Sequence, residues 1–372
     1  MTPLPAPTTT PLLGHLWRWT RDPLDLLAAG ARTGGVFRLR LWRPVVVGYR
    51  PDWNRAVLGD RDTFRSRGSL SGLTPYLSGG VVGSDVPEHD NRRAELNPHF
   101  HSRAVDGFPL RAVAGHHRVA GVFEARGWAA RVVRHMLNAA FFAGRLPDSL
   151  LTRFLEPLHR ANPAPLLPRP LLFRRVDAGI ERILADPPPG TLAAALSRMD
   201  NAIEETRVAL AAGYDTTAHT LAWALWHLAD APGWRRREHL PVVLDEVLRL
   251  YPAGWLGSRI VHRDTTVDDV DLLAGTMVFY SPYLTHRDAE LWRDPAEFRP
   301  ERFADGRPAW GFIPFSAGRR TCLGAHMARR MLTAALEPFC DMPLTRVAGD
   351  PTIAAGITLR PNGALWLAGG WS

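Results

Sequence analysis

One short segment of the chain, residues 315–324, has the residue types and the spacing for metal chemistry. It reads FSAGRRTCLG and places Cys322 in a turn framed by Gly318 and Gly324, just before a predicted helix. A thiolate in such a turn meets backbone N–H groups and the positive end of the helix dipole, and both stabilise negative sulfur. The two glycines permit dihedrals and close approaches that a Cβ would forbid. This is what an axial thiolate ligand of haem iron needs, with the sulfur anionic, fixed and shielded.

The segment resembles the cysteine-ligand loop of the cytochrome P450 family. The matching positions are Phe315, Gly318, Arg320, Cys322 and Gly324. GFIPF leads into the loop, and AHMARRMLTAALEPF leaves it as the predicted helix. The resemblance implies haem b (iron protoporphyrin IX) as the cofactor, with Cys322 as the axial ligand of the iron. A buried cysteine in a glycine-rich turn is the alternative interpretation of this segment alone.

A second motif, AGYDTT at residues 212–217, lies inside a long predicted helix. Glycine and paired threonines are poor helix formers, costing up to about 1 kcal/mol each, so their presence at mid-helix needs a reason. The motif resembles the oxygen-activation motif of the family, in which the helix opens locally over the haem. By that resemblance Ala212 and Gly213 leave room for dioxygen. The Thr216 hydroxyl would hydrogen-bond the bound oxygen, and Asp215 would help to relay protons to it. A helix with a Thr–Thr kink and a solvated aspartate is the alternative.

Haem propionates carry negative charges that need cationic partners, and four residues match family positions for this role. PEHDNRR places His89 and Arg93 four residues apart on one helical face, for which a solvated face is the alternative. Arg259 in GSRIVHRD and Arg320 in the thiolate loop match two further propionate contacts. The resemblance therefore implies a cluster of four cationic residues around the propionates.

A third group matches a structural feature of the family. DEVLRLYP places Glu246 and Arg249 at i and i+3 on one helical face, and PAEFRPERF supplies Arg302. An isolated surface pair of this kind is worth little. By the resemblance, however, the three residues form a buried triad that braces the thiolate loop, so their expected role is structural.

The distribution of predicted elements indicates a mainly α fold with small β-sheets. Residues 36–42 and 45–49 read as paired strands, and short strands return in residues 256–280 and after Leu344. The block between them is mostly helical, so strands at both ends indicate one interleaved domain, residues 1–372, with a short extended segment at 1–13. The resemblance implies the cytochrome P450 fold for this single large domain.

The stretch from about Leu192 to Ala229 predicts a long central helix of about 55 Å at 1.5 Å per residue, enough to cross the whole molecule. Compared with the family, the segments near 145–185 and 230–241 are short. The first of them corresponds to the family's lid helices, so the shortening affects how the site is closed and how a substrate enters it.

Composition narrows the classes of partner. The net charge of +8 comes from arginine alone, because the chain has no lysine. The basic residues are scattered without a basic–aromatic recognition motif, which argues against nucleic acid and favours an acidic protein partner. Two cysteines cannot make a disulfide framework, and Cys340 reads as a small buried hydrophobe, in keeping with a reducing cytoplasm. Neither a signal peptide nor an apolar stretch of membrane-spanning length is found, so a soluble cytoplasmic protein is expected.

The motifs extend over nearly the whole chain and imply a bacterial-type haem-thiolate monooxygenase that inserts one oxygen atom of O2 into an apolar small molecule. No flavin or reductase domain fits in 372 residues. Electrons are therefore expected from an acidic ferredoxin with a separate reductase, docked near Arg319, Arg329 and Arg330. A peroxide-driven peroxygenase and a non-catalytic haem sensor or carrier are the alternatives. The Asp215–Thr216 pair argues against both.

The resemblance places the substrate pocket between four mostly apolar segments. They are the loop at 67–86, the helix at Val208–Ala212, the Trp255–Leu256 segment and the turn around Ile357. This lining favours a hydrophobic natural-product intermediate, such as a terpenoid, a polyketide or an aromatic compound, and thus a role in secondary metabolism.

Overall fold

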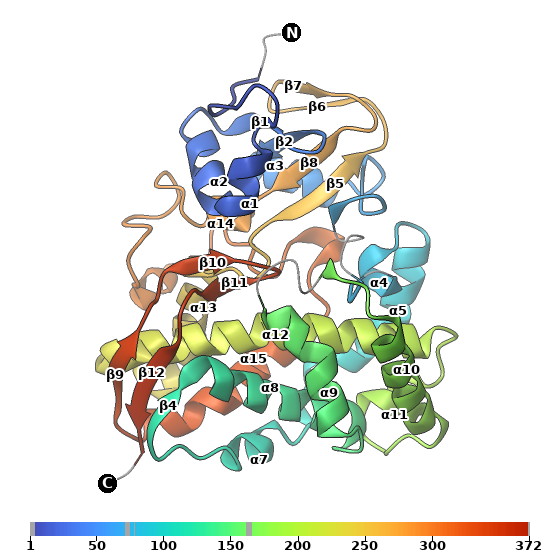
Figure 1. The fold of residues 1–372 in the computed structure, drawn as a ribbon, viewed down its shortest axis with the longest axis vertical. Coiled ribbons are helices and arrows are strands. Elements are labelled where there is room, and N and C mark those ends of the chain that lie inside the picture. The colour runs from blue at the N-terminus through green and yellow to red at the C-terminus, as the bar shows by residue number, and fades with distance from the viewer. Residues whose placement is uncertain (1–3, 71–74, 78, 161–165, 371–372) are drawn as a thin grey trace.

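A long helix, α12 (Ala202–Asp230), runs through the helix-rich part of the computed structural model, which describes residues 4–70, 75–77, 79–160 and 166–370 (Figure 1). Its 29 residues give a length of about 43 Å. The predicted helix was longer and began at Leu192. That start is wrong, because α11 (Leu192–Leu196) is a separate helix that ends at Leu196, and turns follow from Ser197 to Asn201. Ser, Asp and Asn between the two helices compete for backbone hydrogen bonds and favour such turns.

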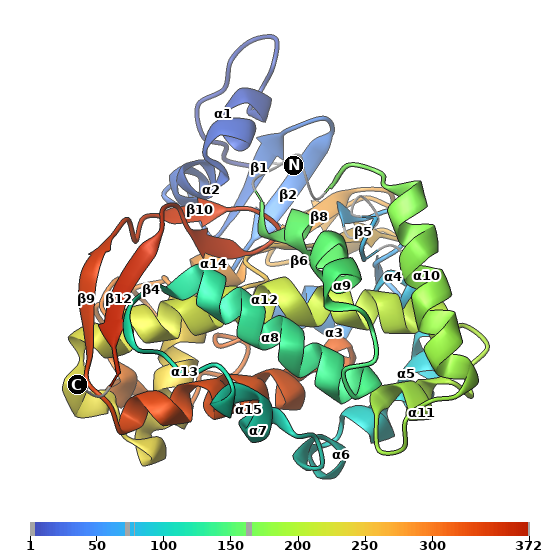
Figure 2. The same ribbon diagram turned by 60° about the horizontal axis from the view of Figure 1, so that its bottom comes forward.

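Several helices cover α12 and bury most of its surface. α8 (Ala125–Phe142) lies along it, and α10 (Pro170–Ala185), α13 (Leu240–Leu250) and α15 (Ala325–Leu336) also pack against it (Figures 1 and 2). Their apolar side chains form one large core. No helix in the described part of the chain is both long enough and apolar enough to cross a membrane.

A five-stranded sheet lies at the opposite end, beside the first helices of the chain (top of Figure 1). Its order is β1 (Val36–Arg40), β2 (Pro44–Gly48), β8 (Met277–Tyr280), β5 (Gly257–Val261) and β3 (Phe64–Arg65). Successive side chains of β2 point to opposite faces of the sheet and pack into two different hydrophobic clusters. Val45 and Val47 pack with α2 (Pro23–Ala31), and Val46 packs with α3 (Pro51–Gly59). The predicted pairing of the first two strands is confirmed, with an antiparallel register that sets Val36 opposite Gly48.

Three smaller sheets complete the strands of the described chain. β4 (Gly121–Glu124), β12 (Leu365–Gly369) and β9 (Leu344–Gly349) form one sheet, β10 (Ile353–Ala355) pairs with β11 (Leu359–Pro361), and β6 (Thr265–Val267) pairs with β7 (Val270–Leu272). The predicted fold class, mainly α with small β-sheets, is confirmed, whereas the single domain over 1–372 stays a prediction.

The remaining elements are short helices and 3-10 turns between these layers. They are α1 (Leu16–Arg21), α4 (Gly80–Gly83), α5 (Glu88–Phe100), α6 (Ser102–Asp106), α7 (Leu110–Gly115), α9 (Asp148–Leu155), η2 (Glu156–His159), η4 (Pro232–Trp234), η5 (Arg237–His239), α14 (Pro282–Thr285), η6 (Pro300–Phe303), η7 (Gly318–Arg320) and η8 (Glu337–Cys340).

Candidate functional site

The loop that carries Cys322 is closed by its own backbone just before α15. The Cys322 N–H donates to the Phe315 carbonyl at 2.8 Å. Gly318 has a φ of +68°, and a Cβ there would lie 2.8 Å from the carbonyl oxygen of Leu58, so this position requires glycine. Gly324 differs, because its φ is −85° and no atom lies within 4 Å of its Cβ position. The prediction that Gly324 is needed for its dihedrals or for a close neighbour is therefore wrong for the described chain.

Cys322 is exposed as a residue, although protein atoms surround its sulfur. The residue is exposed by its solvent-accessible area, but burial of the sulfur within the surrounding protein mass raises the pKa of its thiol. A hydrogen bond from the Gly324 N–H and the positive charge of Arg93 oppose this rise without reversing it. The predicted stabilisation of negative sulfur by the turn is therefore outweighed by burial. Coordination to a metal ion is the interaction that would ionise this thiol outright.

The middle of α12 presents one accessible stripe in an otherwise buried helix. Ala209, Ala212, Gly213 and Thr216 are half-buried, and their spacing places them on one face. The Thr216 hydroxyl donates to the Ala212 carbonyl at 2.7 Å, a back-bond that competes with the backbone hydrogen bonds of the helix and tends to bend it. α12 is one continuous helix over this motif, and the local opening over the haem stays a prediction. A Cβ on Gly213 would lie 3.2 Å from Cδ2 of Leu137, so this glycine also lets α8 approach closely.

Asp215 is held by partners that the motif did not predict. Its buried carboxylate accepts hydrogen bonds from His159 Nδ1 at 2.8 Å and from the Thr358 hydroxyl at 2.7 Å. Burial acts to raise the pKa of Asp215, but the adjacent His219 and His159 outweigh it and hold the pKa well below its ordinary value. The alternative of a solvated aspartate is thereby excluded. His219, one helical turn after Asp215, was visible in the sequence, whereas His159 and Thr358 come from distant segments.

The four residues predicted to bind propionates lie close together although they come from three parts of the chain. His89 and Arg93 belong to α5, Arg259 to β5 and Arg320 to the thiolate loop. Burial lowers the pKa of His89, and Arg320 and Arg93 lower it further against the effect of Asp90. Burial lowers the pKa of Arg320 to about 10, and Arg259 contributes to this shift. His89 therefore senses the positive charge of Arg320 and Arg93, and Arg320 senses that of Arg259.

Positive charge in this cluster exceeds the negative charge that faces it. Arg320 donates to Asp85 Oδ1 at 2.9 Å, but its Nε is buried without a hydrogen-bond partner in the described residues. Arg93 donates to the Thr321 carbonyl at 2.9 Å and Arg259 to the carbonyl of its neighbour Ser258 at 2.7 Å. Neither of these two guanidinium groups has a carboxylate partner within the described ranges. The cluster therefore fits a ligand that brings carboxylates of its own.

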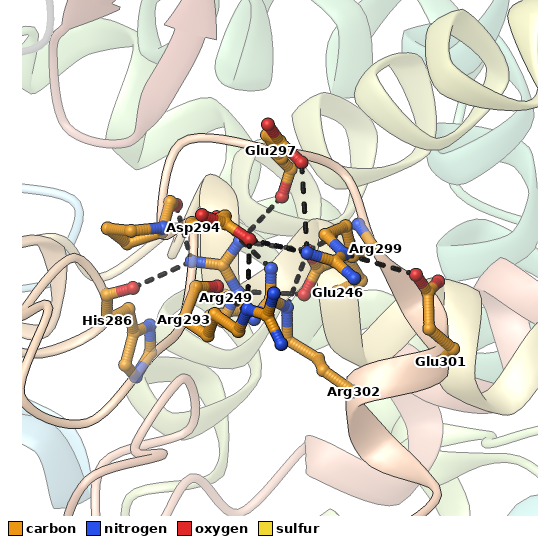
Figure 3. Close-up of polar contacts among 10 residues, drawn as sticks. Glu246, Arg249, His286, Arg293, Asp294, Glu297, Arg299, Glu301 and Arg302 are labelled. Carbon is orange, nitrogen blue, oxygen red and sulfur yellow. Dashed lines mark hydrogen bonds and ion pairs between the residues drawn. The ribbon is translucent and has the colours of Figure 1, made fainter.

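The predicted structural triad forms one hydrogen-bonded network, in which Glu246 and Arg249 are fully buried and Arg302 is 10% exposed (Figure 3). Glu246 and Arg249 are both 0% exposed, and two nitrogens of Arg249 donate to the two carboxylate oxygens at 2.8 Å each. Arg302 Nε donates to the same carboxylate at 3.1 Å. Arg249 also donates to the carbonyl of His286, whose Nε2 accepts the Ile313 N–H at 2.9 Å. Ile313 lies in the segment leading into the thiolate loop, so the triad reaches that loop through His286.

The arginines predicted to dock an electron donor differ in their surroundings. Arg329 donates to the fully buried Asp245 at 2.6 Å, and Arg330 pairs with Asp106 at 2.6 Å while both remain about half exposed. Arg319 is exposed and has no ion pair in the part of the chain that the structure describes. Arg329 therefore has a structural role, which leaves Arg319 and Arg330 as the candidates for docking.

The segments predicted to line a substrate pocket are described in part. Residues 71–74 and 78 of the loop at 67–86 lie outside the described residues. After this gap, the loop is anchored on α12, because the Gly80 N–H donates to Glu204 and the Val81 N–H donates to Glu205. Trp255 is buried and donates from Nε1 to the Gly356 carbonyl at 3.1 Å, which joins two of the predicted lining segments.

Comparison with known proteins gives matches to cytochromes P450. The family model "Cytochrome P450" matches residues 233–339. Mouse cytochrome P450 4V2 is 31% identical over 196 aligned residues, which cover 44% of this chain and 37% of the mouse protein, so the match spans well under half of that relative. Cyclooctat-9-en-7-ol 5-monooxygenase of Streptomyces melanosporofaciens is 25% identical over 392 aligned residues and covers 87% of this chain and 85% of that protein.

Solved structures share the whole fold. Cyanobacterial CYP120A1 with retinoic acid bound superimposes with a TM-score of 0.85 at 22% identity, covering 99% of both chains. CYP175A1 from Thermus thermophillus gives a TM-score of 0.82 at 25% identity, covering 96% of this chain and 97% of that one.

The fold and the site together define a haem-thiolate protein. Cys322 supplies the soft ligand that haem iron takes, and the cationic cluster supplies partners for propionates, so the residues present fit haem b. In sequence and in fold the chain is similar to proteins of the cytochrome P450 family.

Proposed function

We propose that this chain is a haem-thiolate monooxygenase that inserts one atom of dioxygen into an apolar small molecule. The observation that carries the proposal is Cys322, an exposed residue whose thiol lies within reach of the Gly324 N–H and of the positive charge of Arg93. Haem bound there would supply the activation of dioxygen.

The residues divide into four tasks under this proposal. Cys322 holds the iron, Phe315 and Gly318 shape the loop around it, and the Gly324 N–H donates to the sulfur. The propionates are held by His89, Arg93, Arg259 and Arg320. Ala212, Gly213 and Thr216 form the accessible stripe of α12 next to which dioxygen is bound, and Asp215 serves proton transfer from the buried side of the same helix. Glu246, Arg249 and Arg302 maintain the fold that presents the loop.

An apolar substrate is supported by the lining and by one relative. Val208, Trp255 and Leu256 are buried or half-buried apolar side chains on the predicted lining segments. The relative named for its action on cyclooctat-9-en-7-ol covers 87% of this chain. A natural-product intermediate of secondary metabolism is therefore the substrate class we propose.

Electrons are proposed to come from an acidic ferredoxin-type protein reduced by a separate reductase. Arg319 is exposed without an ion pair among the described residues, and Arg330 is paired only with an exposed carboxylate. Attraction to an acidic partner at such a surface weakens as salt rises.

The first experiment is the absorption spectrum of the dithionite-reduced, haem-loaded protein under carbon monoxide. A strongly red-shifted Soret band is expected for the wild type and for Cys340→Ser, which is the matched control because it removes the only other cysteine. The band should be lost in Cys322→Ser. A wild-type spectrum typical of histidine-ligated haem would refute the proposal and favour a haem sensor or carrier.

Oxidant dependence separates the two enzyme classes. The proposed monooxygenase forms product with dioxygen and a ferredoxin–reductase pair more efficiently than with hydrogen peroxide. If peroxide supports the faster turnover, the chain is a peroxygenase instead.

A further inference from the structure

A pocket of about 370 Å³ lies between the end of α7, the middle of α8 and the start of α9, and none of the residues assigned to the haem site lines it. Three imidazoles and one carboxylate line it: His116 and His117 directly after α7, His135 on α8, and Asp148 at the start of α9. The rest of the wall is formed by Val113, Asn138, Ala139, Gly144, Leu146 and Pro147. The side chains of His135 and Asp148 are 39% and 49% exposed, so solvent reaches this group.

Two of the imidazoles face each other through ring nitrogens. His117 Nε2 and His135 Nδ1 lie 2.9 Å apart, with ring centroids 4.8 Å apart and planes inclined by 48°. His135 Nε2 lies 3.2 Å from Asp148 Oδ1. Arg134 donates to both oxygens of Asp148, at 2.7 and 3.1 Å, so this carboxylate is ionised and only accepts hydrogen bonds. His135 therefore carries its proton on Nε2, and its Nδ1 lone pair accepts the proton of His117 Nε2.

This order of groups is the one that supports a histidine ligand of a metal ion. A metal-binding imidazole almost always donates its other ring N–H to a carboxylate or carbonyl, which fixes the tautomer and aims the free nitrogen. Asp148 does this for His135. Ligand nitrogens about 2.0–2.1 Å from a zinc ion lie about 2.9–3.4 Å from one another, and the two imidazole nitrogens are already 2.9 Å apart. The ring planes cross, so rotation of these two half-buried rings brings both lone pairs onto one ion.

The donor set selects the class of ion. Imidazole nitrogen suits Zn²⁺, Cu²⁺ and Ni²⁺, whereas Mg²⁺ and Ca²⁺ prefer oxygen ligands. Asp148 is the one carboxylate among the described lining residues, and Arg134 occupies both of its oxygens. A hard cation would therefore have to compete with a guanidinium group for its carboxylate, whereas a transition-metal ion uses the imidazoles and leaves that ion pair intact.

We propose that this pocket binds one divalent transition-metal ion, Zn²⁺, Cu²⁺ or Ni²⁺, through His117 Nε2 and His135 Nδ1. The ion takes the place of the proton between the two nitrogens. That proton moves to His117 Nδ1, which has no hydrogen-bond partner among the described residues, so both ligands are neutral imidazoles and no proton is released. Water fills the remaining positions of the ion, and the exposed His116 in the same wall is the side chain placed to replace one of these waters.

A second group of candidate ligands, His159, Asp215 and His219, has ligand atoms within 4.8 Å of one another, but its geometry opposes an ion. The two imidazole rings are stacked with planes inclined by only 12°, so their in-plane lone pairs do not meet at one point. The Thr358 hydroxyl bonds to Asp215 Oδ2 at 2.7 Å and to His219 Nδ1 at 2.8 Å. An ion there would break these buried bonds, whereas in the pocket it replaces one partly exposed hydrogen bond.

The test is isothermal titration of Zn²⁺ and Cu²⁺ into the haem-loaded protein, prepared without a histidine tag and dialysed against EDTA. The wild type should bind one equivalent of either ion at this site and no Mg²⁺. Asp148→Asn should weaken the affinity about 10–100-fold, as is typical when the partner of a ligand is lost. His117→Gln and His135→Gln remove a ligand and should weaken it at least as much. Their folding is checked by the reduced carbon monoxide band, which should be unchanged.

His101→Gln is the matched control. His101 also lies beside another imidazole, that of His326, with ring centroids 6.0 Å apart, but neither ring has a carboxylate partner in the described part of the chain. This variant should keep the wild-type affinity.

Two readouts report on the ion itself and on the fold. Zinc-edge X-ray absorption should show two imidazole ligands at about 2.0–2.1 Å in the wild type and fewer in His135→Gln. Because the folded chain alone brings the two nitrogens together, Zn²⁺ should raise the urea midpoint of the wild type and of His101→Gln, but not that of His117→Gln.

The proposal is independent of the monooxygenase function, and the two fail in different ways. Absence of binding in the wild type, or wild-type affinity in the double variant of His117→Gln and His135→Gln, would overturn the metal site. Binding that is lost in His159→Gln and kept in the pocket variants would overturn it as well and assign the ion to the cluster around Asp215. A wild-type protein without the red-shifted carbon monoxide band would overturn the monooxygenase function alone.

Discussion

Replacing Arg249 by methionine tests whether the buried network of Figure 3 holds the fold together. Arg249 is fully buried, pairs with Glu246 through two nitrogens, and donates to the carbonyls of His286, Pro295 and Glu297 at 2.8, 2.8 and 3.0 Å. Methionine fills much of the same volume but makes none of these bonds.

The expected cost follows from the groups left behind. Removing one partner of a buried ion pair costs about 3–5 kcal/mol. Each of the three stranded carbonyls adds about 1–3 kcal/mol unless water reaches it. The free energy of unfolding is typically about 5–15 kcal/mol, so Arg249→Met should consume most of it. Arg302→Met is the matched control, because Arg302 is 10% exposed and makes one bond of 3.1 Å to the same carboxylate, while its two other bonds go to the solvent-exposed carbonyls of Arg293 and Asp294, which water can satisfy.

The measurement is urea unfolding followed by circular dichroism, with equal transition slopes required before midpoints are compared. We expect Arg302→Met to fold with a moderately lowered midpoint and Arg249→Met to be largely unfolded without urea. If the two variants lose the same stability within about 1 kcal/mol, buried pairing does not dominate this region and the reasoning fails.

Three other predictions concern the loop, the buried histidines and the docking surface. Gly318→Ala should destabilise the haem-free chain by about 1–2 kcal/mol, because its φ is +68°, whereas Gly324→Ala should be nearly neutral in urea unfolding; equal losses would contradict the assignment. Burial lowers the pKa values of His227 and His286 to about 3 in the folded chain. The ordinary pKa of histidine is about 6.5, so between pH 6.5 and pH 3 these two side chains are protonated in the unfolded chain but not in the folded one. The free energy of unfolding should therefore fall as the pH drops from 6.5 towards 4, by about 1.4 kcal/mol per pH unit for each histidine. His227→Phe removes one of the two histidines and should lower this slope by about 1.4 kcal/mol per pH unit. Arg319→Glu should slow reduction of the haem by an acidic ferredoxin and make the rate less dependent on salt, with an unchanged carbon monoxide band. Arg329→Glu should chiefly lower the urea midpoint, because the new carboxylate faces Asp245. Unaltered reduction kinetics in Arg319→Glu would show that this surface does not dock the donor.

Features encoded within one stretch of chain were predictable, and features made by distant contacts were not. The first two strands, the thiolate loop and the central helix follow from local pattern, and the structure contains all three. The start of α12 was missed, because Ser, Asp and Asn end α11 although the apolar pattern runs on. No local signal linked Arg329 to Asp245, 84 residues earlier, or Asp215 to Thr358, 143 residues later. The motif residues could therefore be found in the sequence, but the partners that set their protonation could not.

Two features that are unfavourable in the chain by itself are relieved by the same ligand. Burial keeps the Cys322 sulfur protonated, and the neighbouring guanidinium groups of Arg93, Arg259 and Arg320 face too few carboxylates. Iron would ionise the sulfur, and two propionates would supply the missing negative charge. Because Arg93 lies near both the sulfur and the cationic cluster, the two effects act on one site. Binding of haem should thus add to the free energy of folding, since the folded chain alone brings these groups together.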